Sequence, residues 1–198
     1  MINVAQKNKV RDITAIGLMV ALLCISSYIA FPLPFTPIML TSQTIIINLI
    51  AITMNTKNGV LSIIVFYFIG SIGLPVFSGG KSGVGTLVGP SGGYFLGFLL
   101  TVLVISLIKG KNLNLKKSIL LTVFVGMTII YACGVTWMGY YNGLSFMENL
   151  KVSILPFVIG DFIKCVLASF IAVRINKIYR LDHEWCYLWR RTLGKFFS

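Results

Sequence analysis

Two ionisable residues interrupt an apolar segment near the carboxyl end of the chain. Asp161 and Lys164 stand three residues apart in the run ILPFVIGDFIKCVLASF. On a helix this spacing places both side chains on one face, where each can neutralise the other. A charge near the centre of a membrane helix costs roughly 2.5 to 3.5 kcal/mol, so such residues are usually retained for function. An acceptor beside a donor suits a small polar group that carries N–H and C=O on one edge.

A glycine-rich stretch supplies the second set of candidate binding groups. Ten of the chain's 19 glycines fall between Gly70 and Gly97, in GSIGLPVFSGGKSGVGTLVGPSGGYFLG. Glycine permits left-handed backbone and close approach of a ligand, so we expect a shaped, irregular loop at a membrane edge. Its backbone amides, with the side chains of Gln43, Ser91 and Tyr94, could hold a carboxylate or other polar atoms. The apolar surroundings would accept the apolar body of a small amphipathic solute.

The composition identifies the class of protein that must position these groups. Hydrophobic residues make up 57% of the chain and charged residues 11%, and the mean hydropathy is +0.90. We therefore expect an all-α integral membrane protein with six transmembrane helices in one compact bundle. The spans are predicted at residues 13–31, 35–54, 59–77, 92–108, 118–138 and 153–173. Residues 1–12 form a cytoplasmic amino terminus, 13–174 the membrane domain, and 175–198 a basic, aromatic cytoplasmic tail.

Two of these spans need comment. Residues 13–31 follow a polar and basic segment and lack a small-residue cleavage site, which favours a retained span over a signal peptide. The second span contains Pro37 and several polar residues, so its outer part is expected to be irregular.

The distribution of basic residues predicts the orientation. Of the 17 lysines and arginines, 14 lie on the side that carries both termini, and Lys81 and Lys151 lie on the other. Because basic residues near span ends are retained in the cytoplasm, both termini are predicted to be cytoplasmic and the glycine-rich loop extracellular. The same loop then lies level with Asp161 and Lys164, in the outer half of the last span. This proximity favours a functional pair over an ion pair that only joins two helices.

The combined motifs resemble the BioY family, the biotin-specific substrate-binding (S) components of energy-coupling factor (ECF) transporters. They are GLPVFSGG, GPSGGYFLGF, PFVIGDFIK, and PLPFTPI ahead of Gln43. The resemblance implies a plasma-membrane subunit that captures biotin at its outer face with high affinity. It also implies partners, namely a transmembrane coupling (T) protein and two cytoplasmic ATPases. No catalytic residue, metal ligand or cofactor other than the biotin ligand is implied.

The family motifs can be carried over residue by residue. The Asp-x-x-Lys motif falls on Asp161 and Lys164, and the glutamine of span two on Gln43. The remaining predicted ligand-binding residues are those of the glycine turn and of the Gly-Pro-Ser-Gly-Gly-Tyr segment, namely Gly79, Gly80, Ser91 and Tyr94. The chain departs from the family pattern at Thr41-Ser42-Gln43, where Thr-Leu-Gln is expected, and its preceding proline is two residues further away.

Two poses of biotin remain open on this resemblance. In the first, Asp161 accepts from the ureido N–H groups, Lys164 donates to the ureido oxygen, and the valerate carboxylate lies toward the loops. In the second, Lys164 pairs with the carboxylate.

Small residues on the first span predict where the coupling protein docks. Gly17 and Ala21 form a small-xxx-small pair, similar to the family's alanine-based motif, that lets another helix approach closely. Packing within the chain is the alternative for this pair. Gly93 and Gly97 repeat the spacing and are assigned to internal packing.

Other functional classes share single motifs with this sequence. Gly89-Pro90-Ser91-Gly92 matches the Gly-x-Ser-Gly of rhomboid-like proteases, but the only histidine, His183, lies in the predicted cytoplasmic tail. A glycine-loop channel is disfavoured because the loop lacks an acidic ring. Gly80-Lys81-Ser82 lacks the preceding glycine of a nucleotide-binding loop. An S component for another vitamin remains an alternative.

The net charge, the cysteines and the carboxyl-terminal tail each have a structural explanation. The net charge of +12 follows from membrane topology and does not require nucleic acid. The spacing of the four cysteines fits no zinc site, so they are expected to be buried packing residues. The tail, with its tryptophans and arginines, is expected to lie on the anionic inner leaflet, with contact to the ATPases as the alternative.

Overall fold

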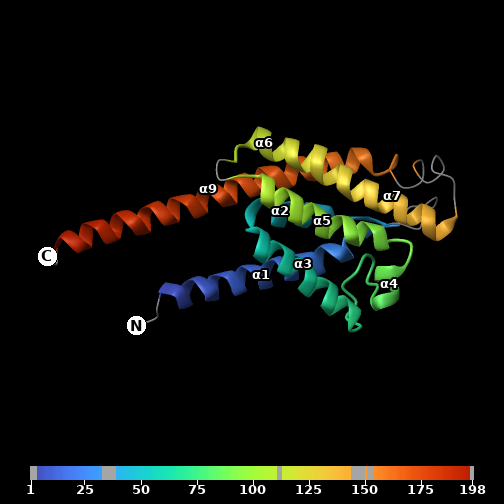
Figure 1. Ribbon diagram of the computed structural model, residues 1–198, viewed down its shortest axis with the longest axis horizontal. Coiled ribbons are helices and arrows are strands. Elements are labelled where there is room, and N and C mark those ends of the chain that lie inside the picture. Colours follow the sequence, from blue (N-terminus) through green and yellow to red (C-terminus); the bar gives the residue numbers. More distant parts are fainter. Residues whose placement is uncertain (1–3, 33–38, 111–112, 144–149, 151–153, 197–198) are drawn as a thin grey trace.

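The computed structural model describes residues 4–32, 39–110, 113–143, 150 and 154–196, and within these the side chains of all but 4, 5, 7, 8, 142 and 179–196. Most of the described chain is helical (Figure 1). The helices are α1 (Val4–Tyr28), α2 (Gln43–Thr53), α3 (Thr56–Ser71), α4 (Val84–Val88), α5 (Gly92–Ile108), α6 (Leu115–Leu120), the π-helix η1 (Leu121–Met127), α7 (Thr128–Asn142) and α9 (Val158–Phe196).

Each of the six predicted spans overlaps one of the long helical segments, with α6, η1 and α7 running as one through the fifth. Several bounds were wrong. The first helix begins at Val4 and ends at Tyr28, because Ala30–Phe31 forms strand β1. The second helix begins at Gln43 and not at residue 35, because Leu40–Thr41 forms strand β2 instead. The third ends at Ser71 and not at residue 77, because the chain turns at Gly73 with a φ of +108°. The last continues beyond residue 173 as one helix to Phe196.

The expectation of a purely helical fold is corrected by one short sheet. Strand β1 (Ala30–Phe31) pairs antiparallel with β2 (Leu40–Thr41), with Ala30 opposite Thr41. The pair links the end of α1 to the start of α2. It places Thr41 beside the first turn of α2, which matters for the site described below.

The two ends of the bundle differ in what they carry (Figure 1). The amino and carboxyl termini lie at the same end of the molecule, and α4 with the glycine-rich loop lies at the other. This arrangement agrees with the prediction that both termini share one side of the membrane. Helix α9 extends well beyond the other helices at the end that carries the termini.

Helices α5 and α7 approach each other closely through two glycines. A Cβ at Gly93 would lie 2.3 Å from the carbonyl oxygen of Cys133, and one at Gly97 would lie 2.8 Å from Cα of Ile130. Both distances are shorter than side-chain contacts allow, so only glycine permits this packing. The assignment of Gly93 and Gly97 to internal packing is confirmed.

The distribution of polarity is that of a protein surrounded by lipid. Large apolar side chains face outward, such as Ile13, Phe124 and Ile159 with 69%, 68% and 76% exposure, while Gln43 and Asn48 are fully buried. Within the described residues, two helical stretches are long and apolar enough to cross a bilayer, Lys9–Tyr28 and Leu115–Tyr141. Three other apolar helices, α2, α3 and α5, are shorter.

Lys109 hydrogen-bonds the carboxyl end of α2, the shortest of these three helices. Helix α2 has 11 residues, a length of about 16 Å, so its last carbonyl groups lie inside the bundle. The Lys109 Nζ donates to the carbonyl oxygens of Ala51 at 3.1 Å and Ile52 at 2.9 Å, and also to that of Met54. Burial lowers the pKa of Lys109 to about 8. The lysine thus supplies hydrogen bonds that the helix end would otherwise lack.

The glycine-rich loop is shaped as the sequence predicted. Four of its glycines have positive φ, namely Gly73, Gly79, Gly80 and Gly83. Phe77 is fully buried and anchors the loop, because its ring packs against Phe66 at 5.5 Å and Phe95 at 5.0 Å between centroids. Gly70 makes this possible, since a Cβ there would lie 2.1 Å from the Phe77 ring.

Candidate ligand-binding site

A cavity lies between the glycine-rich loop and helices α2, α5, α7 and α9. Its polar lining residues are Thr41, Thr44, Ser78, Lys81, Thr86, Ser91, Tyr94, Tyr131, Asp161 and Lys164. Its apolar lining residues are Met39, Leu40, Phe95, Phe98, Ile130 and Phe157. A cavity with several aromatic walls and converging polar groups is typical of a site for a small amphipathic molecule.

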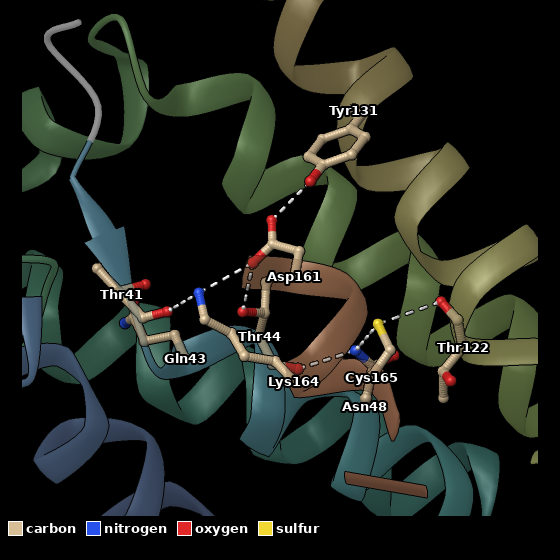
Figure 2. Close-up of polar contacts among 9 residues, drawn as sticks. All are labelled: Thr41, Gln43, Thr44, Asn48, Thr122, Tyr131, Asp161, Lys164 and Cys165. Carbon is tan, nitrogen blue, oxygen red and sulfur yellow. Dashed lines mark hydrogen bonds and ion pairs between the residues drawn. The ribbon is translucent and has the colours of Figure 1, made fainter. Parts of the chain in front are cut away.

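Asp161 is the centre of the polar groups (Figure 2). Its Oδ1 accepts from Lys164 Nζ at 2.9 Å and from the Thr44 hydroxyl at 3.3 Å, and its Oδ2 accepts from the Tyr131 hydroxyl at 2.7 Å. The predicted pairing of Asp161 and Lys164 on one helix face is confirmed. Three helices, α2, α7 and α9, therefore meet at one carboxylate.

Asp161 and Lys164 keep hydrogen-bonding positions that a ligand can use. A carboxylate has about four acceptor positions, and three are used here. Lys164 has three N–H donors; one is used by Asp161 and a second by the Thr41 carbonyl oxygen at 2.7 Å. With respect to the described residues, one acceptor position of Asp161, on Oδ2, and one N–H donor of Lys164 remain. This combination can receive a group that presents N–H and C=O on one edge.

A second layer of polar contacts supports Asp161 from behind (Figure 2). The Asn48 Nδ2 donates to the Thr44 carbonyl oxygen at 2.9 Å and to the Cys165 sulfur at 3.4 Å. The Cys165 thiol in turn donates to the carbonyl oxygen of Thr122 at 3.6 Å. These contacts join α2, η1 and α9 next to the residues that bond Asp161. Cys165 is buried, as predicted, whereas Cys24 and Cys133 are only partly buried.

The structure places Gln43 behind the cavity wall. It is fully buried, and its Oε1 accepts from the Ser78 hydroxyl at 2.9 Å and the Thr41 hydroxyl at 3.4 Å. Ser78 and Thr41 line the cavity, whereas Gln43 does not. Gln43 thus links the glycine-rich loop to the start of α2, and a direct contact between Gln43 and a ligand stays a prediction.

The other predicted residues divide into two groups. Ser91 and Tyr94 line the cavity. Gly79 and Gly80 lie in the loop next to it but not in its lining. A Cβ at Gly79 would lie 2.5 Å from the Met39 sulfur, so this glycine lets a lining side chain occupy its position.

Six polar lining residues were not predicted from the sequence: Thr41, Thr44, Ser78, Lys81, Thr86 and Tyr131. Lys81 could have been predicted as a site residue, because it is the one lysine of the glycine-rich stretch. Tyr131 could not, since no sequence spacing relates position 131 to position 161.

The predicted docking pair lies on the outside of α1. Gly17 and Ala21 are both exposed, and no described atom lies within 4 Å of a Cβ built at Gly17. The alternative that Gly17 serves packing within the chain is therefore not supported by the described residues.

Comparison with known proteins identifies the family. Residues 3–181 match the model of the BioY family. The chain is 35% identical to the "Biotin transporter BioY" of Thermotoga maritima, over 85% of this chain and 97% of that protein. It is 30% identical to the "Biotin transporter BioY2" of Lactococcus lactis, over 90% and 96% of the two chains.

A solved structure of a related protein has the same fold. The crystal structure of the S-component for biotin from an ECF-type ABC transporter superposes with a TM-score of 0.81 at 28% identity, covering 86% of this chain and 93% of that one. The matched proteins are membrane transporter components and not enzymes. Because the family model spans most of the sequence and the fold agrees over the same length, this chain belongs to the BioY family.

Proposed function

We propose that this chain is the biotin-binding S component of an ECF transporter and that biotin binds in the cavity around Asp161. The observation that carries the proposal is the one acceptor position of Asp161 and the one N–H donor of Lys164 that no described residue uses, in a cavity that also has aromatic walls. The ureido ring of biotin presents N–H groups beside a C=O. The aromatic side chains Phe95, Phe98 and Phe157 suit its fused ring system and aliphatic chain.

The charges around the cavity favour the pose with the ureido ring at Asp161. The Lys164 ammonium is already neutralised by Asp161 at 2.9 Å, so it has little charge to offer a ligand carboxylate. Lys81 lines the cavity from the glycine-rich loop and is exposed. We infer that the valerate carboxylate lies toward Lys81.

The basic test is equilibrium binding of biotin to the purified protein in detergent by titration calorimetry. We expect saturable binding that excess thiamine or riboflavin does not prevent. Binding of one of these vitamins instead of biotin would contradict the proposed ligand while leaving the family assignment intact.

Neutralising the carboxylate of the ligand tests the pose. An exposed ion pair contributes up to about 1 kcal/mol, so biotinamide should bind about two- to fivefold more weakly than biotin. In Lys81→Gln the two ligands should bind alike, because the charge that distinguishes them is gone. Lys57→Gln, at the other end of the bundle, is the matched control and should retain the difference. If Lys81→Gln retains it too and Lys164→Gln abolishes it, the reverse pose is correct.

Tyr131 should be a positioning residue for Asp161. Hydrogen bonds to charged groups are worth about 1.5 to 3 kcal/mol, part of which the ligand can replace, so Tyr131→Phe should weaken biotin binding roughly tenfold. Tyr140→Phe removes a hydroxyl from the same helix at a residue that is 90% exposed, and should change nothing. Unchanged affinity in Tyr131→Phe would show that Asp161 is held without this bond.

The proposal includes the arrangement in the membrane and the partners. Both termini (1–12 and 175–198) would be cytoplasmic, with the six-helix domain 13–174 in the plasma membrane and the cavity near its outer face. Exposed Gly17 and Ala21 support α1 as the surface that meets the T protein. Two cytoplasmic ATPases would supply the energy, because no nucleotide-binding motif was found in the sequence.

A further inference from the structure

A second cavity, of ≈ 130 Å³, lies at the far end of α2 from Asp161. Helix α2 separates the two cavities by about 16 Å, the length of an 11-residue helix. Residues of α1, of the end of α2, of the turn into α3 and the start of α3, and of α9 line it. The polar side is formed by Arg11, Asp12, Asn55 and Asn58, and the apolar side includes Ala15 and Ile175.

The polar side combines donors with one carboxylate. Arg11 contributes a guanidinium group, and Asn55 contributes its amide NH2, because its Oδ1 already accepts from the Asn58 backbone N–H at 2.8 Å. Asp12 is partly buried, and it makes no hydrogen bond or ion pair with any residue whose placement the structure describes. A carboxylate in the cavity lining favours a ligand that carries its own positive group.

The apolar side continues toward the middle of the bundle. Ala15 lies one helical turn from Arg11 and Asp12, in the direction of the membrane interior. Neighbouring residues on the outside of α1 are apolar and exposed, such as Ile13 and Leu18. At this end α1 and α9 both extend beyond the other helices (Figure 1). From the end of the bundle inward, the lining changes from charged to apolar groups. A membrane lipid has the same order, from its headgroup to its acyl chains.

We propose that this cavity binds the headgroup of a phosphatidylethanolamine-type lipid in the leaflet opposite the biotin cavity. Its phosphate would accept from Arg11 and the Asn55 amide, and its ammonium would donate to Asp12. The start of an acyl chain would pack against Ala15 and Ile175. A phosphatidylglycerol headgroup has no cation for Asp12, and the trimethylated ammonium of phosphatidylcholine has no N–H to donate. The inference does not depend on biotin being the ligand of the first cavity.

The test uses the complete chain, delipidated in detergent, with lipid binding followed by native mass spectrometry. Phosphatidylethanolamine should bind about two- to fivefold more tightly than phosphatidylcholine or phosphatidylglycerol, the range expected for one partly exposed ion pair. The affinities of the N-methyl and N,N-dimethyl derivatives of phosphatidylethanolamine should lie between those of phosphatidylethanolamine and phosphatidylcholine. This series needs no variant and is therefore independent of folding. Equal binding of all lipids, or tightest binding of phosphatidylglycerol, would overturn the proposal.

Variants locate the preference in this cavity. Asp12→Asn should bind phosphatidylethanolamine and phosphatidylcholine alike, while Arg11→Gln should weaken both. Lys116→Gln removes an exposed positive charge from α6 and should change neither ratio. A preference for phosphatidylethanolamine that survives in Asp12→Asn would place the lipid elsewhere. A preference that appears only when the T protein is bound would assign the cavity to that partner.

Discussion

Replacing Asp161 by asparagine should weaken biotin binding by roughly a hundredfold, as expected when a charged hydrogen-bond acceptor is lost. The carboxylate receives three donors, from Thr44, Tyr131 and Lys164, and has one position left for the ligand. An asparagine amide has only one acceptor oxygen, and its NH2 would face groups that are themselves donors. Calorimetric titration of parent and variant measures the loss. Asp12→Asn makes the same chemical change at the other end of the molecule and should leave biotin affinity unaltered.

A double variant separates a binding role from a structural one. Asp161→Asn leaves Lys164 partly buried without a counter-charge, so the melting temperature should fall as well. Adding Lys164→Met removes that charge, and the melting temperature should recover toward that of the parent protein. Biotin binding should not recover, because the carboxylate and the ammonium group are then both absent. Recovery of binding together with stability would mean that the pair only joins parts of the bundle.

Gly93→Ala should destabilise the fold by about 3 kcal/mol or more, the upper part of the range for overpacked interiors. The new methyl group would lie 2.3 Å from a backbone carbonyl oxygen of α7, and backbone cannot move aside as a flexible side chain can. Thermal unfolding in detergent, followed by tryptophan fluorescence, measures the change.

Gly85→Ala is the matched control for this substitution. Gly85 also lies in a helix, α4, and a Cβ there meets nothing within 4 Å. Its melting temperature should stay within a degree or two of the parent value, given the small effect of an unstrained surface substitution. Equal behaviour of the two variants would show that α5 and α7 can separate at little cost.

The helices could be predicted well because each long apolar run must satisfy its own backbone hydrogen bonds in lipid. The errors lie where apolar residues serve another purpose. Phe77 was assigned to the third span by its hydrophobicity, but it belongs to the loop that folds back over Gly70. Leu40 was assigned to the second span and instead pairs with Phe31 in a short sheet. Hydropathy does not distinguish a residue that faces lipid from one that fills the bundle.

Site residues on one helix could be predicted, whereas those that other helices contribute could not. Asp161 and Lys164 could be predicted because their contact depends on spacing within one helix, which the sequence displays directly. Tyr131 and Thr44 bind the same carboxylate from two other helices, and nothing local relates them to it. Gln43, which the resemblance placed among the ligand contacts, accepts hydrogen bonds from Ser78 and Thr41, two residues that line the cavity. Its own contact with a ligand stays a prediction.

The sequence by itself determined that this is a helical membrane protein of the BioY type, with a paired charge in its last helix and a loop that needs glycine. Composition and spacing within one element carry that information, because each helix must be stable in lipid before it packs. Only the tertiary structure decided how many hydrogen-bonding positions Asp161 keeps for a ligand, and that Lys81 stands at the same cavity. It also brought Arg11 and Asp12 together with Asn55 in a second cavity. These facts depend on how separate helices approach one another, which close packing at glycines and buried hydrogen bonds between helices determine.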